Sequence, residues 1–163
     1  MPTIRTEPLT VAAFAPFGQV IDTSRPPLGI NAGSTQRFHD LARIELAGAG
    51  ARPLISIFRG QHKSFPIALT VMERHPLGSQ AFQPLSNRVF LVSVAPDDNG
   101  LPGEPRAFLT APGQGVNIAM NIWHSPLTAL EDISDFLVVD RGGEGDNLVL
   151  VNFPEPYTVV LAV

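Results

Sequence analysis

The sequence places an acid, an imidazole and an amide around one short corner. Glu73 and His75 are two residues apart, so on a β-strand their side chains point to the same side. Pro76-Leu77-Gly78 then predicts a turn, and Gln80 follows as the chain resumes. A carboxylate beside an imidazole can carry out general acid–base catalysis, and with the amide it can also hold a divalent metal.

A second imidazole, His124, stands in a similar setting. A strand is expected from Gly115 to about Ala119, and Asn121 can make the next turn because asparagine tolerates a positive φ. His124 then begins the following strand. Either histidine alone is more often structural, but two imidazoles that meet beside Glu73 would form a catalytic site.

For the other polar candidates, a structural role is weighed against a functional one. His39 is expected to be a capping or hydrogen-bonding residue, and His62 to lie in a solvated turn. Trp123 is expected to pack. Asp140 and Arg141 end a strand, where they could form a salt-bridged turn or bind substrate.

Glu73 could also be only an ion-pair partner, of Arg74 or Arg88. Arg74 lies between two residues expected to face inward, so it should point outward, to pair with an acid or to enter a neighbouring subunit's site. Arg141 and Arg37 are further candidates to bind a substrate carboxylate.

The segments that position these residues have sequence patterns that predict short strands. Fourteen glycines and 16 prolines separate apolar runs at fairly regular intervals, which predicts an all-β sandwich or barrel. Several runs are apolar at both parities and should be buried on both faces, against a second subunit in the simplest case. The expected strands are 54–58, 67–72, 89–95, 107–110, 115–122, 136–140, 148–151 and 157–163.

Helix is expected in two places only. Thr10 can cap a short N-terminal helix over 11–15, which Pro16 and Gly18 end, and a second short helix is expected around Leu41–Leu46. Residues 97–103 predict an exposed turn. No linker or repeat is visible, so residues 1–163 are expected to form a single domain.

The composition of the chain limits the classes of molecule that it is expected to bind. Charged residues are only 16% of the 163 and the net charge is −4, so a buried homodimer interface is expected and nucleic acid is not. No apolar run approaches a membrane span, no signal peptide is visible, and there is no cysteine; these features favour a cytoplasmic protein without membrane partners.

The spacing of the two histidine motifs resembles that of cupin barrels. Glu73-x-His75 with Gln80 is similar to the first cupin motif, and the hexapeptide from Ala119 to His124 is similar to the second. This resemblance implies a cupin-like antiparallel β-barrel of the jelly-roll type, with Glu73, His75, Gln80 and His124 as candidate ligands of a divalent metal. The residues do not require that cofactor, because a neutral amide is a poor ligand.

A closer resemblance is to the ureidoglycolate lyase family, and it runs from about residue 8 to the C-terminus. The family cleaves ureidoglycolate into glyoxylate and urea in allantoin and purine catabolism, which implies catalytic roles for Glu73, His75 and His124. It also implies substrate-binding roles for Gln80, Asn117, Arg74, Arg141 and Asp140. The segments that carry the resemblance are 14–21, 37–42, 73–82, 114–117, 122–124 and 135–143.

The chain departs from the family next to the expected site. Where family members carry Tyr-His-Arg, this chain has Ile118-Ala119-Met120, and Ser125 replaces a second histidine. The cation for the substrate carboxylate must then come from elsewhere in the chain or from a partner subunit. Two alternatives stay open: a divergent relative acting on another small hydroxy or keto acid, and a non-catalytic barrel that binds a small carboxylate or serves as a scaffold.

Overall fold

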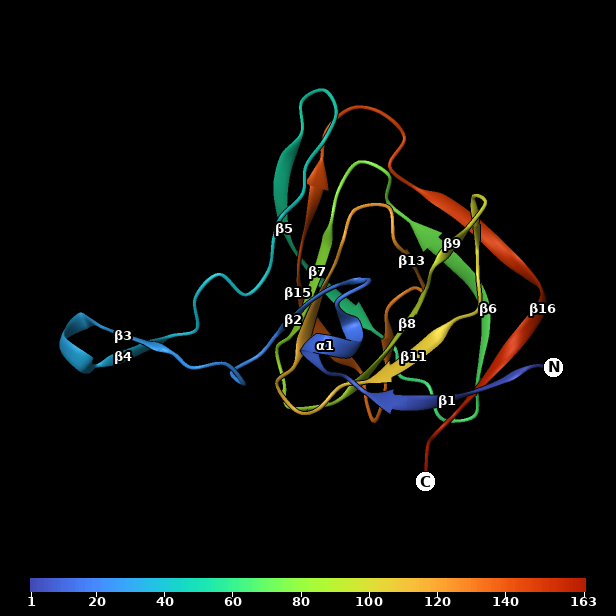
Figure 1. Ribbon diagram of the computed structural model, residues 1–163, viewed down its shortest axis with the longest axis horizontal. Helices are drawn as coiled ribbons and strands as arrows, with labels where there is room; N and C mark the ends of the chain where they lie inside the picture. The colour runs from blue at the N-terminus through green and yellow to red at the C-terminus, as the bar shows by residue number, and fades with distance from the viewer.

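A computed structural model describes residues 1–163, and nearly all of its regular structure is β-strand (Figure 1). The first sheet runs in the order β11-β1-β16-β6-β13-β8 and closes through pairing of β8 with β11, while β14 adds to β8. Its strands are β1 (Thr3–Pro8), β6 (Ile67–Arg74), β8 (Phe90–Ala95), β11 (Arg106–Leu109), β13 (Trp123–His124), β14 (Thr128–Ala129) and β16 (Val149–Val160).

This closed barrel is mixed, so the expectation of a purely antiparallel barrel is wrong. β1 lies between β11 and β16 and is parallel to both. Parallel neighbours need a long connection, and here about a hundred residues or more separate β1 from each of its neighbours along the chain. Apolar alternation predicts that a segment is a strand, but it does not predict the direction of its neighbours.

The second sheet is antiparallel throughout and packs against β8 and β11. Its order is β2-β12-β7-β15-β5, and the main core lies between it and the barrel wall, with Phe14, Phe82, Val94, Phe108 and Val138 among its members. The strands are β2 (Gly18–Ile21), β5 (Arg52–Gly60), β7 (Gln80–Pro84), β12 (Gly115–Ile118) and β15 (Ser134–Gly142).

β8 is buried along its whole length, as its two-sided apolar sequence predicts. The cover, however, comes from the chain itself and not from a second subunit. Phe90, Val92 and Val94 face the main core, while Leu91 and Ala95 face a second core built around Trp123 and Met72.

The only α-helix, α1 (Val11–Phe14), is a single turn, and no helix of the structure has the length to cross a bilayer. The Thr10 hydroxyl accepts a hydrogen bond from the Ala13 N–H at 3.1 Å, the usual N-cap contact. Phe14 is fully buried and packs on Phe108 with ring centroids 5.5 Å apart, which seats the turn on the main core.

No helix forms over Leu41–Leu46, and that expectation is wrong. The segment runs extended over the outer face of the second sheet. Side chains satisfy its N–H groups: Arg43 donates to Gln19 Oε1 at 3.1 Å and Glu45 donates to Ser79 Oγ at 2.8 Å. These tertiary bonds replace the i to i−4 bonds that a helix would make.

β16 is one strand where two separate runs were expected. It continues from Val149 to Val160 through Pro154 and Pro156, and its register with β6 shifts between Asn152 and Tyr157. Such an irregularity accommodates prolines, which cannot donate to the sheet.

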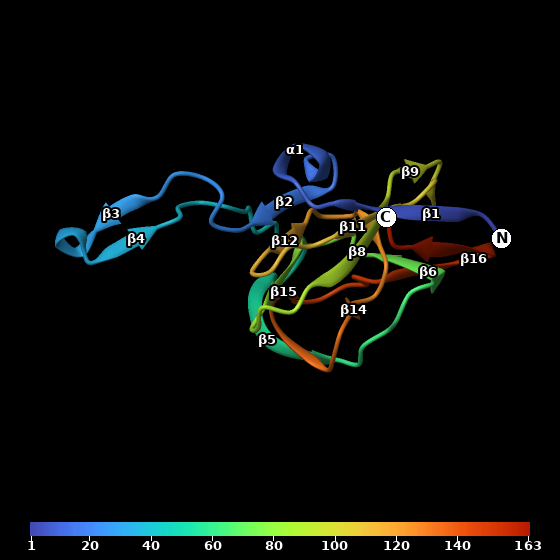
Figure 2. The same cartoon turned by 90° about the horizontal axis from the view of Figure 1, so that it is seen from below.

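Two hairpins lie outside these sheets. The first, β9 (Asp97–Asp98) and β10 (Leu101–Pro102), occupies the turn expected at 97–103. The second comprises β3 (Leu28–Ile30), the 3-10 turn η1 (Asn31–Gly33) and β4 (Thr35–Arg37). It extends far from the rest of the molecule in both views (Figures 1 and 2), and sequence analysis did not predict it.

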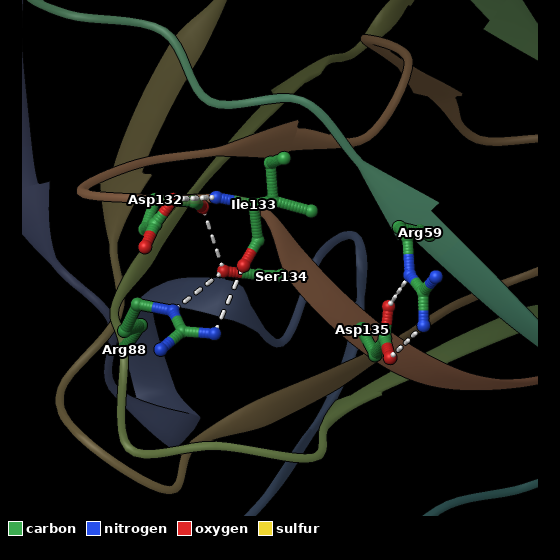
Figure 3. Close-up of polar contacts among 6 residues, drawn as sticks. All are labelled: Arg59, Arg88, Asp132, Ile133, Ser134 and Asp135. Carbon is green, nitrogen blue, oxygen red and sulfur yellow. Dashed lines mark hydrogen bonds and ion pairs between the residues drawn. The ribbon is translucent and has the colours of Figure 1, made fainter.

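Charged contacts fix the edge of the second sheet (Figure 3). Arg59 on β5 lies directly opposite Asp135 on β15 and donates to both carboxylate oxygens, at 2.8 and 3.0 Å. Arg88 donates to the Ser134 hydroxyl at 3.0 Å and to the Ile133 carbonyl at 2.9 Å. Arg88 is thus occupied away from Glu73.

The Arg59–Asp135 contact, together with a hydrogen bond from Trp123 to Asp97, predicts that the stability of the fold decreases in acid. The hydrogen bond from Arg59 lowers the pKa of Asp135, and the hydrogen bond from Trp123 lowers that of Asp97, each from an ordinary value of 3.8. Because both folded-state values lie below the unfolded ones, their stabilisation is present above about pH 5 and is lost as pH falls through 3.8 and below. We expect a lower urea midpoint at pH 3 than at pH 6, and a smaller difference in Asp135→Asn. Equal midpoints at both pH values would contradict this.

Candidate active site

Glu73 and His124 meet because their strands pair. The two residues are direct cross-strand partners between β6 and β13, so their side chains share one face. The turn before β13 contains Asn121 with φ 65°, the positive value that the sequence predicts. The Asn121 N–H donates to the His75 carbonyl at 2.9 Å, which ties this turn to the end of β6.

Three side chains form the centre of the site, which we call the Glu73 cluster: Glu73, His75 and His124. Glu73 Oε1 lies 3.4 Å from His124 Nε2 and 3.8 Å from His75 Nε2. The two imidazole centroids are 5.2 Å apart. His124 is 2% exposed whereas His75 is 17% and Glu73 20% exposed, so the cluster opens to solvent on the side of His75 and Glu73.

Backbone carbonyls fix the orientation of both imidazoles. His75 Nδ1 lies 2.8 Å from the Asn147 carbonyl, and His124 Nδ1 lies 2.9 Å from the Ile122 carbonyl. A carbonyl oxygen only accepts, so each Nδ1 must carry a hydrogen. Both Nε2 atoms are therefore directed at Glu73, and His124 Nε2 has no partner that satisfies hydrogen-bond geometry.

Gln80 and Asp140 extend the cluster from the second sheet. Gln80 Oε1 lies 3.2 Å from His75 Nε2, and the Gln80 amide nitrogen donates to Asp140 Oδ2 at 3.2 Å. Asp140 therefore orients the amide so that its oxygen faces the imidazole. Both ring nitrogens of His75 thus face an oxygen atom, the Asn147 carbonyl at Nδ1 and Gln80 Oε1 at Nε2.

The surroundings of Glu73 favour its charged form. The contact with the His124 imidazole, whose Nε2 lies 3.4 Å from Oε1, is the main cause that lowers the pKa of Glu73 from its ordinary value of 4.5, and the charges of His124 and His75 act in the same direction, against burial. Glu73 is thus a carboxylate throughout the neutral range.

The donor atoms of the cluster also fit a divalent metal. The ligand atoms of Glu73, His75 and His124 all lie within 4.8 Å of one another, and a carbonyl partner on each Nδ1 is the usual support of a metal-binding histidine. Gln80 supplies a fourth oxygen. Two imidazoles and two oxygens suit Zn, Mn, Fe or Ni.

Arg74 points away from the cluster, as strand alternation predicts. Its guanidinium stacks over Trp123, 4.3 Å from the ring centroid, and donates to Asp97 at 2.7 Å. Trp123 is fully buried and belongs to the second core, which makes it a packing residue.

Arg141 and Asn117 also lie outside the cluster, on the outer face of the second sheet. Arg141 donates to the carbonyls of Ala47 and Glu144, at 2.6 and 2.7 Å. Asn117 donates to Gln19 and to the Arg43 carbonyl. Both side chains are buried because segment 41–50 crosses this face, so they hold that segment and do not face the imidazoles.

The remaining histidines are exposed. His62 forms only an isolated bridge with Ala129, and His39 and Arg37 lie at the base of the projecting hairpin, exposed like the rest of it. None of the three contacts the Glu73 cluster of its own chain.

Two residues that organise the site, Asn147 and Glu45, carry no local sequence signal. Asn147 accepts from His75 through its carbonyl and from the Leu77 N–H through Oδ1 at 2.8 Å. Glu45 accepts from the Met120 N–H at 2.9 Å. Neither lies near a histidine motif in sequence, and only the fold brings them there.

Comparison with known proteins gives a consistent result. The family model described as ureidoglycolate lyase matches residues 1–160. A protein from Chelativorans sp. (strain BNC1) named ureidoglycolate lyase is 58% identical over 99% of this chain and 98% of its own. Proteins of the same name from Burkholderia mallei (54% identical; 95% of this chain, 92% of theirs) and Brucella melitensis (59%; 90% and 87%) are also similar. The chain belongs to the ureidoglycolate lyase family.

Proposed function

We propose that this protein is a carbon–nitrogen lyase that splits ureidoglycolate into glyoxylate and urea, a step of allantoin catabolism. Family membership supports the reaction, and the observation that carries the mechanism is the pair of oriented imidazoles flanking one carboxylate. Glu73, His75 and His124 are the proposed catalytic residues, and Gln80 and Asp140 position the substrate and His75.

The reaction needs one proton removed and one delivered. In ureidoglycolate one carbon bears a hydroxyl, a carboxylate and a ureido nitrogen. As a base takes the hydroxyl proton, the carbon–oxygen double bond of glyoxylate forms, the carbon–nitrogen bond breaks, and an acid protonates the departing nitrogen to give urea.

The two imidazoles are suited to these opposite roles. His124 Nε2 faces Glu73 Oε1 at 3.4 Å without a hydrogen bond of good geometry, so it is the ring nitrogen best placed to take a proton, and His124 is the proposed base. His75, with acceptors opposite both ring nitrogens, is the acid. Glu73 lies between them and stabilises whichever imidazole is charged, so it can return the proton from His124 to His75 after each turnover.

A bound metal is the alternative use of the same atoms. Held by Glu73, His75, His124 and Gln80, a divalent cation would polarise the substrate hydroxyl and lower its pKa. An Nε2 atom that ligates a metal cannot also exchange a proton, so the two arrangements exclude each other. The position of Gln80 Oε1 opposite His75 Nε2, which suits a proton between them, favours acid–base catalysis.

Metal removal distinguishes these arrangements. We expect protein treated with a chelator to keep its thermal midpoint, and added Zn²⁺, Mn²⁺ or Ni²⁺ to leave that midpoint unchanged. A metal that binds the native site, present at a concentration ~100 times its Kd, would raise the free energy of unfolding by about 2.7 kcal/mol and the thermal midpoint by several degrees. Glu73→Gln should remove this effect. Such stabilisation would contradict the acid–base proposal and support metal catalysis.

The second candidate function is binding of a small carboxylate without cleavage. The observation that favours it is the apolar Ile118, which lies opposite Gln80 across β7 and β12, together with the outward position of Arg74. Incubation with ureidoglycolate separates the candidates. The lyase releases glyoxylate and urea in equal amounts without ammonia; a binding protein gives a dissociation constant for glyoxylate and no product.

We also propose a homodimer of a single-domain, cupin-like chain that acts in the cytoplasm. The support for the homodimer is the outer face of β5, where Ile55 is 76% and Ile57 54% exposed beside Leu137 and Val139 on β15. Contiguous exposed apolar side chains are typical of an interface. Light scattering should give twice the 17.5 kDa chain mass, and a monomeric mass at micromolar concentration would contradict the proposal.

A further inference from the structure

We propose that the projecting hairpin, residues 25–39, reaches over a second copy of the chain and brings Arg37 to the Glu73 cluster of that copy. There the guanidinium binds the substrate carboxylate. This inference rests on the proposed lyase function and homodimer, and it assigns the cation that the reaction requires.

The acids at the site of one chain have no arginine or lysine partner of their own. Glu73 has only histidines as charged partners within 4 Å, and Asp140 has no ion pair. Arg74 and Arg141, the two arginines nearest in sequence, are held elsewhere by Asp97 and by backbone carbonyls. A carboxylate substrate would therefore meet no arginine or lysine among these groups.

The hairpin has no supporting surface within its own chain. β3 and β4 pair only with each other, and an isolated two-stranded hairpin is marginally stable in water at best. Arg25 anchors its base by donating to the Val20 carbonyl at 2.7 Å. From there to the tip at Asn31 the hairpin extends about 20 Å at ~3.3 Å per residue.

One face of the hairpin combines apolar side chains with a cation. The cross-strand pairs are Leu28 with Arg37 and Ile30 with Thr35, and paired residues share a face. Leu28 is 54% and Ile30 36% exposed. These apolar side chains can pack on another chain while Arg37, on the same face, is presented to it.

Charge and position both favour a second copy as the occupant. Residues 25–39 contain two arginines and no acid, whereas the site contains Glu73, Asp140 and Glu45. In both views the hairpin extends on the same side of the molecule as β5 (Figures 1 and 2), whose exposed Ile55 and Ile57 mark the proposed dimer face. A copy docked on that face would lie under the hairpin.

The first test does not depend on activity. The chain has no cysteine, so a cysteine pair in Thr35→Cys, Asp146→Cys has no background. Residue 146 is exposed and adjoins Asn147, which contacts His75. A bismaleimide that spans ~10 Å should give a covalent dimer on a denaturing gel. Each single variant should give little, and no dimer from the pair would overturn the contact.

The second test asks whether Arg37 acts in trans. Arg37→Gln should raise KM for ureidoglycolate roughly 10- to 100-fold, the usual worth of a charged hydrogen bond, with a smaller change in kcat. Refolding the Arg37→Gln variant with an equal amount of the inactive Glu73→Gln variant yields mixed dimers. If the hairpin acts in trans, one of the two sites in each mixed dimer has both its own Glu73 and the Arg37 of the other chain. Activity at low substrate should then recover to roughly a quarter of wild type. No recovery would overturn the proposal.

Control variants separate this proposal from its alternatives. Arg5 is exposed and has no side-chain partner, so Arg5→Gln should leave KM unchanged. Arg52 lies opposite Gly142 at the end of β5, on the same face of the sheet as Asp140, and is therefore the alternative arginine within the chain. A rise in KM in Arg52→Gln but not in Arg37→Gln would show that Arg52 binds the substrate carboxylate. If wild type forms no glyoxylate but the cross-link forms, the lyase function fails while the contact stands.

Discussion

Replacing His124 with alanine lowers kcat for ureidoglycolate by roughly 10²–10⁴, the usual contribution of a positioned acid or base. The effect is large because His124 Nε2 is the only unpartnered imidazole nitrogen beside Glu73. Water cannot replace it efficiently in a position that is 2% exposed. Steady-state release of glyoxylate measures the change.

Controls keep this loss distinct from misfolding. Far-UV circular dichroism and the urea midpoint should show a folded His124→Ala variant, and added imidazole should restore part of kcat by occupying the vacated space. His62→Ala, which removes an exposed histidine outside the cluster, should behave as wild type. Loss of kcat with equal loss in His62→Ala would show that the assay reports stability and not catalysis.

Trp123→Ala should cost about 3–5 kcal/mol of the free energy of unfolding, as large aromatic truncations in a core do. Trp123 is fully buried in the second core, and Arg74 stacks on its ring while Asp97 accepts its Nε1–H at 2.9 Å. Since Trp123 directly precedes His124 on the two-residue β13, the cavity would also loosen the catalytic imidazole.

The matched control is Trp123→Phe. It keeps most of the packed ring and loses one hydrogen bond to the exposed Asp97, so it should cost about 1 kcal/mol. Urea unfolding followed by circular dichroism gives both values. If Trp123→Ala lowered the free energy of unfolding by less than about 1 kcal/mol, the structural role of this ring in the second core would be contradicted.

Local sequence patterns predicted the part of the site that depends on strand geometry. The two-residue spacing of Glu73 and His75, the turn at Pro76-Leu77-Gly78 and the positive φ of Asn121 are all properties of a few neighbouring residues. The structure accordingly brings Glu73, His75, Gln80 and His124 together.

What depends on distant segments could not be predicted in this way. Arg141 and Asn117 were expected at the site, but alternation leaves them on the outer face, where segment 41–50 buries them. The parallel placement of β1 and the contact of Asn147 with His75 have the same origin. Pairing between segments far apart in sequence, not local propensity, determines each of them.

The double variant His75→Ala, His124→Ala tests the central claim most directly. Assayed with ureidoglycolate beside wild type, it should be folded and should release glyoxylate and urea at a rate reduced by at least the ~10²-fold expected for loss of one acid or base. Unimpaired turnover by the folded double variant would contradict the assignment of catalysis to the Glu73 cluster, and would direct attention to His39 and Asp40.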